Sequence, residues 1–153
     1  MAFPAPTHTR VTANTSPAVN RWIERRTRTR IQRAHAGGIG AIDQRLAQLD
    51  REWDIERCLE AGASSLMLTG VLLGAAHNRR WLLLSLGVGG FLLQHALQGW
   101  CPPLPVLRRF GVRTAEEINR ERYALKALRG DFADVSAAEP RGQAVVAYRG
   151  ALR

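Results

Sequence analysis

The chain has 153 residues and a formal net charge of +9, with 22 basic residues against 13 acidic ones. Apolar residues make up 46% of it, but they gather in one central segment and leave short, charge-rich flanks. Such flanks cannot bury the core of a sizeable soluble catalytic domain, so we expect no large soluble enzyme.

Residues 1–37 are predicted to form a disordered basic tail. Prolines at positions 4, 6 and 17 lie among small polar residues, which is typical of segments that stay unfolded. The start has no apolar stretch of the signal-peptide kind, so we expect no cleaved secretory signal. The near absence of acids before residue 35 keeps an organellar transit peptide as a minor alternative.

Six arginines and a single glutamate occupy positions 21 to 33. The simplest interpretation is a solvated tail, and attraction to lipid phosphates is the main functional alternative. Nucleic-acid binding is disfavoured because no recognised motif accompanies the run. The residues predicted to contact anionic lipid head groups are Arg21, Arg25, Arg26, Arg28, Arg30 and Arg33.

Residues 38–60 are predicted to form an amphipathic helix after a glycine-rich linker. Its apolar seam consists of Ile39, Ile42, Leu46, Leu49 and Trp53, at the three- and four-residue spacing of one helix face. From Asp43 to Glu60 there are six acids and three arginines, whereas helices that adsorb to lipid are rich in basic residues. The seam is therefore predicted to bind a protein partner or a second copy of the chain.

Residues 61–107 are predicted to form a transmembrane hairpin. Only two charged residues, Arg79 and Arg80, lie between Glu60 and Arg108. They separate apolar runs at about 61–78 and 81–100, each long enough at ~1.5 Å per residue to cross a hydrocarbon core of ~30 Å. The expected fold class is an all-α membrane protein, with this hairpin flanked by amphipathic cytoplasmic helices.

Small residues recur at four-residue spacing in both runs, at Gly70 and Gly74 in the first and at Ser85 and Gly89 in the second. Small side chains let helix backbones approach closely, and packing drives helix association in lipid. These faces are predicted to join the two helices of the hairpin. Homodimerisation or docking to another membrane subunit is the alternative.

Gln94 and His95 lie inside the second run, and polar residues at membrane depth raise a functional hypothesis. His95 could bind haem or relay protons, but a neutral imidazole that is hydrogen-bonded to the other helix explains it more simply. The sequence has no metal-ligand spacing, so we predict neither a metal site nor a cofactor.

The two cysteines flank the hairpin, Cys58 before it and Cys101 after it, and would share its cytoplasmic face. A reducing compartment argues against a structural disulfide. Both are predicted to be packing thiols. A thiol site is the alternative, since Arg57, Arg108 and Arg109 lie near enough in sequence to lower a thiol pKa.

After the hairpin, Pro102, Pro103 and Pro105 prevent a regular helix from continuing. Thr114 and Glu117 have the spacing of a capping box, which predicts a cytoplasmic helix over 114–130 that ends at Gly130. Residues 131–153 show little periodicity and are predicted to be a tail.

Basic residues near the ends of the spans predict the orientation. Eight arginines flank the hairpin on its outer sides, against two in the turn, so both termini are expected to be cytoplasmic. The flanking residues are Arg45, Arg51, Arg57, Arg108, Arg109, Arg113, Arg120 and Arg122.

Three stretches resemble the YgaP-like inner-membrane transmembrane domain family, in a longer bacterial branch. They run over residues 45–57, 99–103 and 108–114, and the segment Gly99-Trp100-Cys101-Pro102 is the most specific. The resemblance covers roughly residues 39–132. It implies a hairpin in the bacterial inner membrane that some members attach to a rhodanese-type sulfurtransferase domain, which this chain lacks.

The sequence as a whole predicts a non-enzymatic inner-membrane hairpin protein that acts as an anchor, accessory or assembly subunit of a membrane complex. Its expected partners are the lipid bilayer, with its anionic head groups, and a second copy or another membrane subunit. The alternative is a sulfur or redox carrier that uses the thiol of Cys101.

Overall fold

The computed structural model describes residues 6–138 and 142–152, so the parts of the predicted tails at 1–5, 139–141 and 153 lie outside it. Helices and turns, with no strand, make up these described residues, which confirms the all-α prediction. Two compact units are present. The first unit combines the chain up to Trp22 with Trp53–Ala115, and the second combines Ile23–Glu52 with the chain from Glu116 onward.

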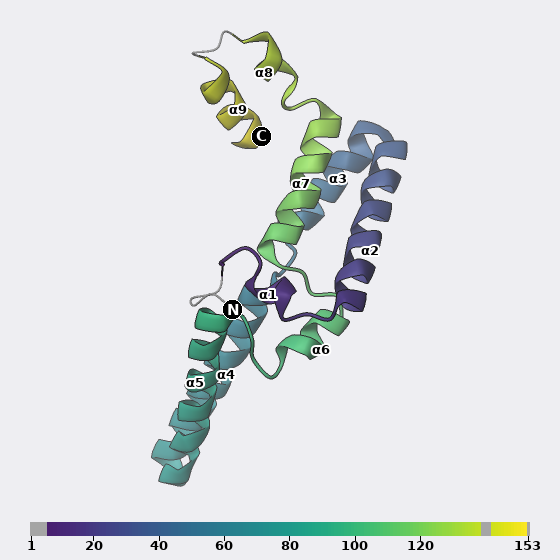
Figure 1. The fold of residues 1–153 in the computed structure, drawn as a ribbon. Helices are drawn as coiled ribbons and strands as arrows, with labels where there is room; N and C mark the ends of the chain where they lie inside the picture. The colour runs from purple at the N-terminus through teal and green to yellow at the C-terminus, as the bar shows by residue number, and fades with distance from the viewer. Residues whose placement is uncertain (1–5, 139–141, 153) are drawn as a thin grey trace. The chain divides into compact units, whose positions relative to one another are not determined.

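The first unit is built around two long apolar helices, α4 (Ile55–Ala76) and α5 (Leu82–Gln98). They lie side by side and are joined by the short 3-10 helix η1 (Arg79–Trp81), as Figure 1 shows. The Asp54 side chain caps α4 by accepting the backbone N–H of Arg57 at 2.8 Å. At the other end of the pair, Gly99 ends α5 in the left-handed conformation, with φ +74°.

Helix α4, and helix α5 taken together with η1 as Arg79–Gln98, are long and apolar enough to cross a membrane, and they are poorly covered by the rest of the chain. Only 17% and 11% of their most apolar windows are buried. Leu72 is 67% exposed and Leu86 is 73% exposed. The core helix of a soluble protein would be mostly buried, and a continuous apolar surface of this kind indicates contact with lipid or protein.

The four predicted packing residues all lie where α4 meets α5. A Cβ atom on Gly70 would come within 2.4 Å of the Ser85 hydroxyl oxygen and 3.0 Å of the Trp81 carbonyl oxygen. One on Gly74 would lie 2.7 Å from a methyl carbon of Leu82, and one on Gly89 would touch Met67 at 3.5 Å. The Ser85 hydroxyl donates to the Met67 carbonyl at 2.9 Å. These residues therefore serve packing within the chain.

The prediction of a disordered tail is wrong, because the described part of this segment is largely helical. It forms α1 (Arg10–Ala13) and α2 (Pro17–Ala36), and Pro17 occupies the first position of its helix, where a missing N–H costs nothing. Val11 is buried in a core with Ile55, Leu59 and Leu104 of the same unit. Tertiary contacts of this kind are not visible in local composition.

The arginine run lies on α2 as an ordered helix. Arg28 forms an ion pair with Glu24 at 2.6 Å, although both side chains are well exposed. Arg30 is half-buried and the other five arginines are exposed, namely Arg21, Arg25, Arg26, Arg28 and Arg33. Their contact with anionic lipid stays a prediction.

The second unit packs α3 (Gly38–Leu49) and α7 (Ala115–Arg129) together with the later part of α2. Ile42, Leu46 and Leu49 of α3 form one core with Ile118 and Leu125 of α7. The seam predicted for an external partner is thus covered by a helix of the same chain. Its two ends lie outside that core, with Ile39 65% exposed and Trp53 49% exposed.

The prediction of a single helix over 38–60 is also wrong, since α3 ends at Leu49 and α4 begins at Ile55. The break lies where Asp54 is extended, with φ −80° and ψ 173°, and caps α4 as the start of a new helix. Ion pairs join α3 and its end to α7. Arg45 binds the buried Glu121 at 2.7 Å, and Arg122 binds Asp50, the residue that ends α3, at 2.9 Å. A third pair joins Arg129 to Asp43.

The predicted helix over 114–130 is confirmed as α7, with Gly130 after its end at φ +95°. The prediction of an unstructured tail over 131–153 is wrong, because this segment contains two short helices, α8 (Ala133–Ala137) and α9 (Gln143–Leu152). The Lys126 ammonium donates to the Ala151 carbonyl at 2.6 Å, which ties the end of α9 to α7.

Replacing Gly70 with isoleucine is expected to separate α4 from α5, because its Cβ atom has no room beside Ser85. The expected loss of stability is about 1–3 kcal/mol, measured by denaturant titration of the full chain in detergent micelles. Gly87 is the matched control, since a Cβ atom there meets nothing within 4 Å. Equal stability of the two variants would contradict this packing.

Candidate functional site

A polar network lies at the end of the apolar pair that is opposite to η1, and Glu56 is its centre. The Arg10 guanidinium donates to Glu56 Oε1 at 2.9 Å, and His95 Nε2 lies 2.8 Å from Glu56 Oε2. One carboxylate from the first turn of α4 thus joins α1 to the last turn of α5.

His95 is 3% exposed, and its ring orientation is fixed by this contact. A carboxylate can only accept hydrogen bonds, so Nε2 carries the hydrogen that faces Glu56. The other ring nitrogen, Nδ1, is buried and makes no hydrogen bond with the residues that the structure describes. His95 is therefore bonded to the other helix, as predicted, with one ring nitrogen left over; the neighbouring Gln94 is half-buried and outside this network.

Further hydrogen bonds hold the N-terminal segment against the end of α5. The Asn14 amide donates to the Gln98 carbonyl at 2.8 Å, and Arg10 also reaches the Ala96 carbonyl at 3.3 Å. Gly99 allows this close approach, because a Cβ atom there would lie 2.5 Å from the Cβ of Arg10. Any larger residue at position 99 would displace Arg10 from Glu56.

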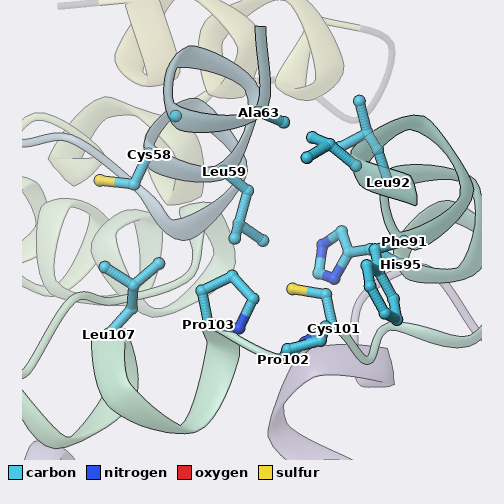
Figure 2. Close-up of a pocket in the computed structure, with 12 residues that line it drawn as sticks. Cys58, Leu59, Ala63, Phe91, Leu92, His95, Cys101, Pro102, Pro103 and Leu107 are labelled. Carbon is cyan, nitrogen blue, oxygen red and sulfur yellow. The ribbon is translucent and has the colours of Figure 1, made fainter. Parts of the chain in front are cut away.

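Beside the network lies a pocket of about 350 Å³. Figure 2 shows His95 and Cys101 on one wall, with Phe91 and Leu92 next to them and Cys58 on the opposite side. The wall side chains are apolar apart from the imidazole and two thiols. Small-molecule sites are typically apolar hollows of this size with a few polar groups, so the pocket is the candidate site.

The structure places both predicted thiol residues on the pocket wall, as free cysteines. In Figure 2 the sulfur atom of Cys101 points toward the middle of the pocket, whereas that of Cys58 points away from it. Cys101 is 3% exposed, and this burial raises the pKa of its thiol. A raised pKa lowers the thiolate fraction at neutral pH, so the environment does not activate Cys101 as a nucleophile.

The arginines that were expected to lower a thiol pKa are engaged elsewhere or exposed. Arg108 is buried and donates to the Thr15 hydroxyl at 3.1 Å, to the Asn20 amide oxygen at 2.9 Å and to the Val112 carbonyl at 3.1 Å. Arg57 lies over the Trp53 ring at 4.7 Å, and Arg109 is exposed. The expectation that Arg108 and Arg109 raise the thiolate fraction of Cys101 is thus wrong, because burial raises the pKa of this thiol.

Sequence reasoning missed Glu56 and Arg10 as site residues. Glu56 was counted only as one of six acids in an amphipathic segment, and Arg10 was assigned to a disordered tail. The only available signal was an acid close to the start of a long apolar run. Among the described residues, no group of three or more His, Cys, Asp and Glu side chains could hold a metal ion.

No known protein family matches the chain, and no curated protein or solved structure is similar to it. The resemblance to the YgaP-like family therefore stays a prediction. What this site can do must be argued from its own residues.

Replacing Glu56 with alanine is expected to release both Arg10 and His95, at a cost of roughly 1–3 kcal/mol for the lost charge-assisted hydrogen bonds. Amide hydrogens of residues 10–14 should then exchange about tenfold faster, as measured by mass spectrometry of the full chain in micelles. Glu60 is the control, because it is exposed on the next turn of the same helix. Unchanged protection of residues 10–14 would mean that the network does not anchor this segment.

Proposed function

We propose that this chain is a non-enzymatic bacterial inner-membrane protein whose helices α4 and α5 form a transmembrane hairpin. The observation that carries the proposal is the apolar surface of both helices, which the rest of the chain leaves largely uncovered. In water this surface would favour aggregation, whereas in a bilayer it faces acyl chains. The resemblance to the YgaP-like family supports the inner membrane as the location.

The proposed orientation places both termini in the cytoplasm and η1 in the periplasm. Arginines near the outer ends of the helices outnumber Arg79 and Arg80 in the turn, and the positive-inside rule favours the richer side as cytoplasmic. The exposed arginines of α2 would then be on the cytoplasmic side, where anionic lipid head groups attract basic residues.

The proposed role is that of an anchor, accessory or assembly subunit. The small-residue faces of α4 and α5 are used within the chain, so a homodimer or another membrane subunit would have to use the outer apolar surfaces of the pair. Van der Waals packing against a second span is the physical basis for such an association.

The topology can be tested with single cysteines in a chain that carries Cys58→Ser and Cys101→Ser. A cysteine in place of Asn78 is expected to react with an impermeant thiol reagent added to intact cells, and one in place of the exposed Ala18 is not. The chain should also resist extraction by alkaline carbonate. Labelling at position 18 and not at position 78 would indicate the opposite orientation. Release of the chain by carbonate would contradict membrane insertion.

A thiol carrier is the second candidate function, and one observation favours it: Cys58 and Cys101 line the same pocket as His95. The raised pKa of Cys101 opposes it, because a carrier needs a thiolate. We therefore rank this function below the anchor.

The alkylation rate of Cys101 in a Cys58→Ser chain distinguishes the two candidates. Because burial raises the thiol pKa, the rate is expected to be low at pH 7 and to rise with a midpoint above about 8.5, the value of an unperturbed cysteine. Iodoacetamide labelling followed by mass spectrometry measures this profile. A midpoint near neutral pH, or a persulfide on the isolated protein, would favour the carrier.

A further inference from the structure

Small residues leave the pocket between α4, α5 and the segment after them open. Gly62 and Ala63 belong to its wall on α4, and a Cβ atom on Gly62 would meet no atom of the described residues within 4 Å. Gly70 on the same helix differs, because a Cβ atom there would collide with the Ser85 hydroxyl group. Close contact between the helices therefore explains Gly70, whereas at Gly62 the missing side chain leaves space for another molecule.

The pocket wall offers little to a polar ligand. His95 Nε2 lies 2.8 Å from Glu56 Oε2, and His95 Nδ1 is buried, so neither ring nitrogen is free to bind a ligand in the pocket. The sulfur atom of Cys58 points away, and the thiol of Cys101 is a weak hydrogen-bonding group. A polar ligand would lose its hydration without compensation, and a buried water needs about two to four polar partners. The occupant that fits this wall is apolar.

The place of the pocket in the fold indicates where such an occupant comes from. Gly62 and Phe91 on the wall are exposed on the two apolar helices, so the pocket is continuous with their uncovered apolar surface. Pro102 and Pro103, which are also exposed, follow the end of α5, and Figure 2 shows them across the pocket from Leu92. The pocket thus extends from the surface that faces acyl chains in the proposed hairpin to the point where the chain leaves it.

From these observations we infer that the pocket holds one acyl chain of a membrane lipid, which lies against the sulfur atom of Cys101. The choice of a membrane lipid rests on the proposed function. A volume of about 350 Å³ is near the lower end for ligand pockets, so it suits one chain and not a whole two-chain lipid. In a bilayer the chain gains van der Waals contacts with a wall that otherwise lacks partner atoms on one side.

Cys101 reports on the occupancy of the pocket, because its sulfur atom points toward the middle. The test is the rate of iodoacetamide alkylation in a Cys58→Ser chain at a pH of about 9, where more of the thiol is ionised. The full chain is held in micelles of a steroid-based detergent, which has no acyl chain to fill the pocket. Palmitoyl-lysophosphatidylglycerol is the probe, and glycerophosphoglycerol, which has the same head group without the chain, is the matched control.

The probe is expected to slow alkylation saturably, by about tenfold when it is present at ten times its dissociation constant, because only a tenth of the pockets are then empty. Glycerophosphoglycerol is expected to have no effect. Absence of protection by the probe, or equal protection by the compound without a chain, would overturn the proposal. Alkylation that slows with protein concentration and not with the probe would indicate a second copy as the occupant, and would also overturn it.

Two glycine variants separate binding in the pocket from a general effect of the probe on the micelle. Neither Gly62 nor Gly87 has any described atom within 4 Å of an added Cβ, but only Gly62 lines the pocket. Gly62→Leu is expected to abolish the effect of the probe, because its side chain occupies the space, and Gly87→Leu is expected to leave the effect unchanged. Ala63→Leu, also on the wall, replaces Gly62→Leu if that variant does not fold. Full protection in the chain with the filled pocket would contradict the proposal.

The outcomes are distinguishable from failure of the proposed function, because micelles replace the bilayer in this test. Release of the chain by carbonate together with full protection of Cys101 would contradict membrane insertion and leave an acyl-chain pocket. Stable insertion without protection would overturn the pocket alone.

Discussion

The first unit depends on one carboxylate. Glu56 lies one residue inside α4, where it accepts hydrogen bonds from Arg10 and His95, two residues that are far apart in sequence. Without this contact, α1 would lose an anchor on α4 and a buried imidazole would lose its partner. A charge at the end of an apolar helix is thus stabilised locally by partners of the same unit.

Different interactions hold α4 and α5 together in the middle of the pair and at its end. In the middle of the pair, Gly70, Gly74 and Ser85 let the two backbones approach closely. The hydroxyl group of Ser85 also donates a hydrogen bond to the other helix. At the end that holds Glu56, hydrogen bonds join the helices to each other and to α1. A pocket lies there next to Cys101 and His95. A closely packed contact between the two helices therefore lies next to a pocket that has room for a ligand.

Sequence periodicity predicted the elements that depend on local chemistry. The two apolar runs, the cap at Gly130 and the packing glycines follow from composition and spacing, and the structure has them at or near the predicted positions. Elements that depend on distant contacts were missed. Residues 10–15 fold because Val11, Arg10 and Thr15 meet partners from residues 55–108, and no local pattern encodes such contacts. The same holds for Leu46, whose seam is covered by α7.

The pairing of α3 with α7 has a consequence for synthesis on the ribosome. Leu49 leaves the ribosome roughly 70 residues before Ile118, an interval on the order of ten seconds at typical elongation rates. During this time α3 presents its apolar face without the helix that covers it, while the two hydrophobic helices are still being made. A nascent chain of this kind exposes a site for chaperones, and the second unit can be completed only after the central helices have emerged.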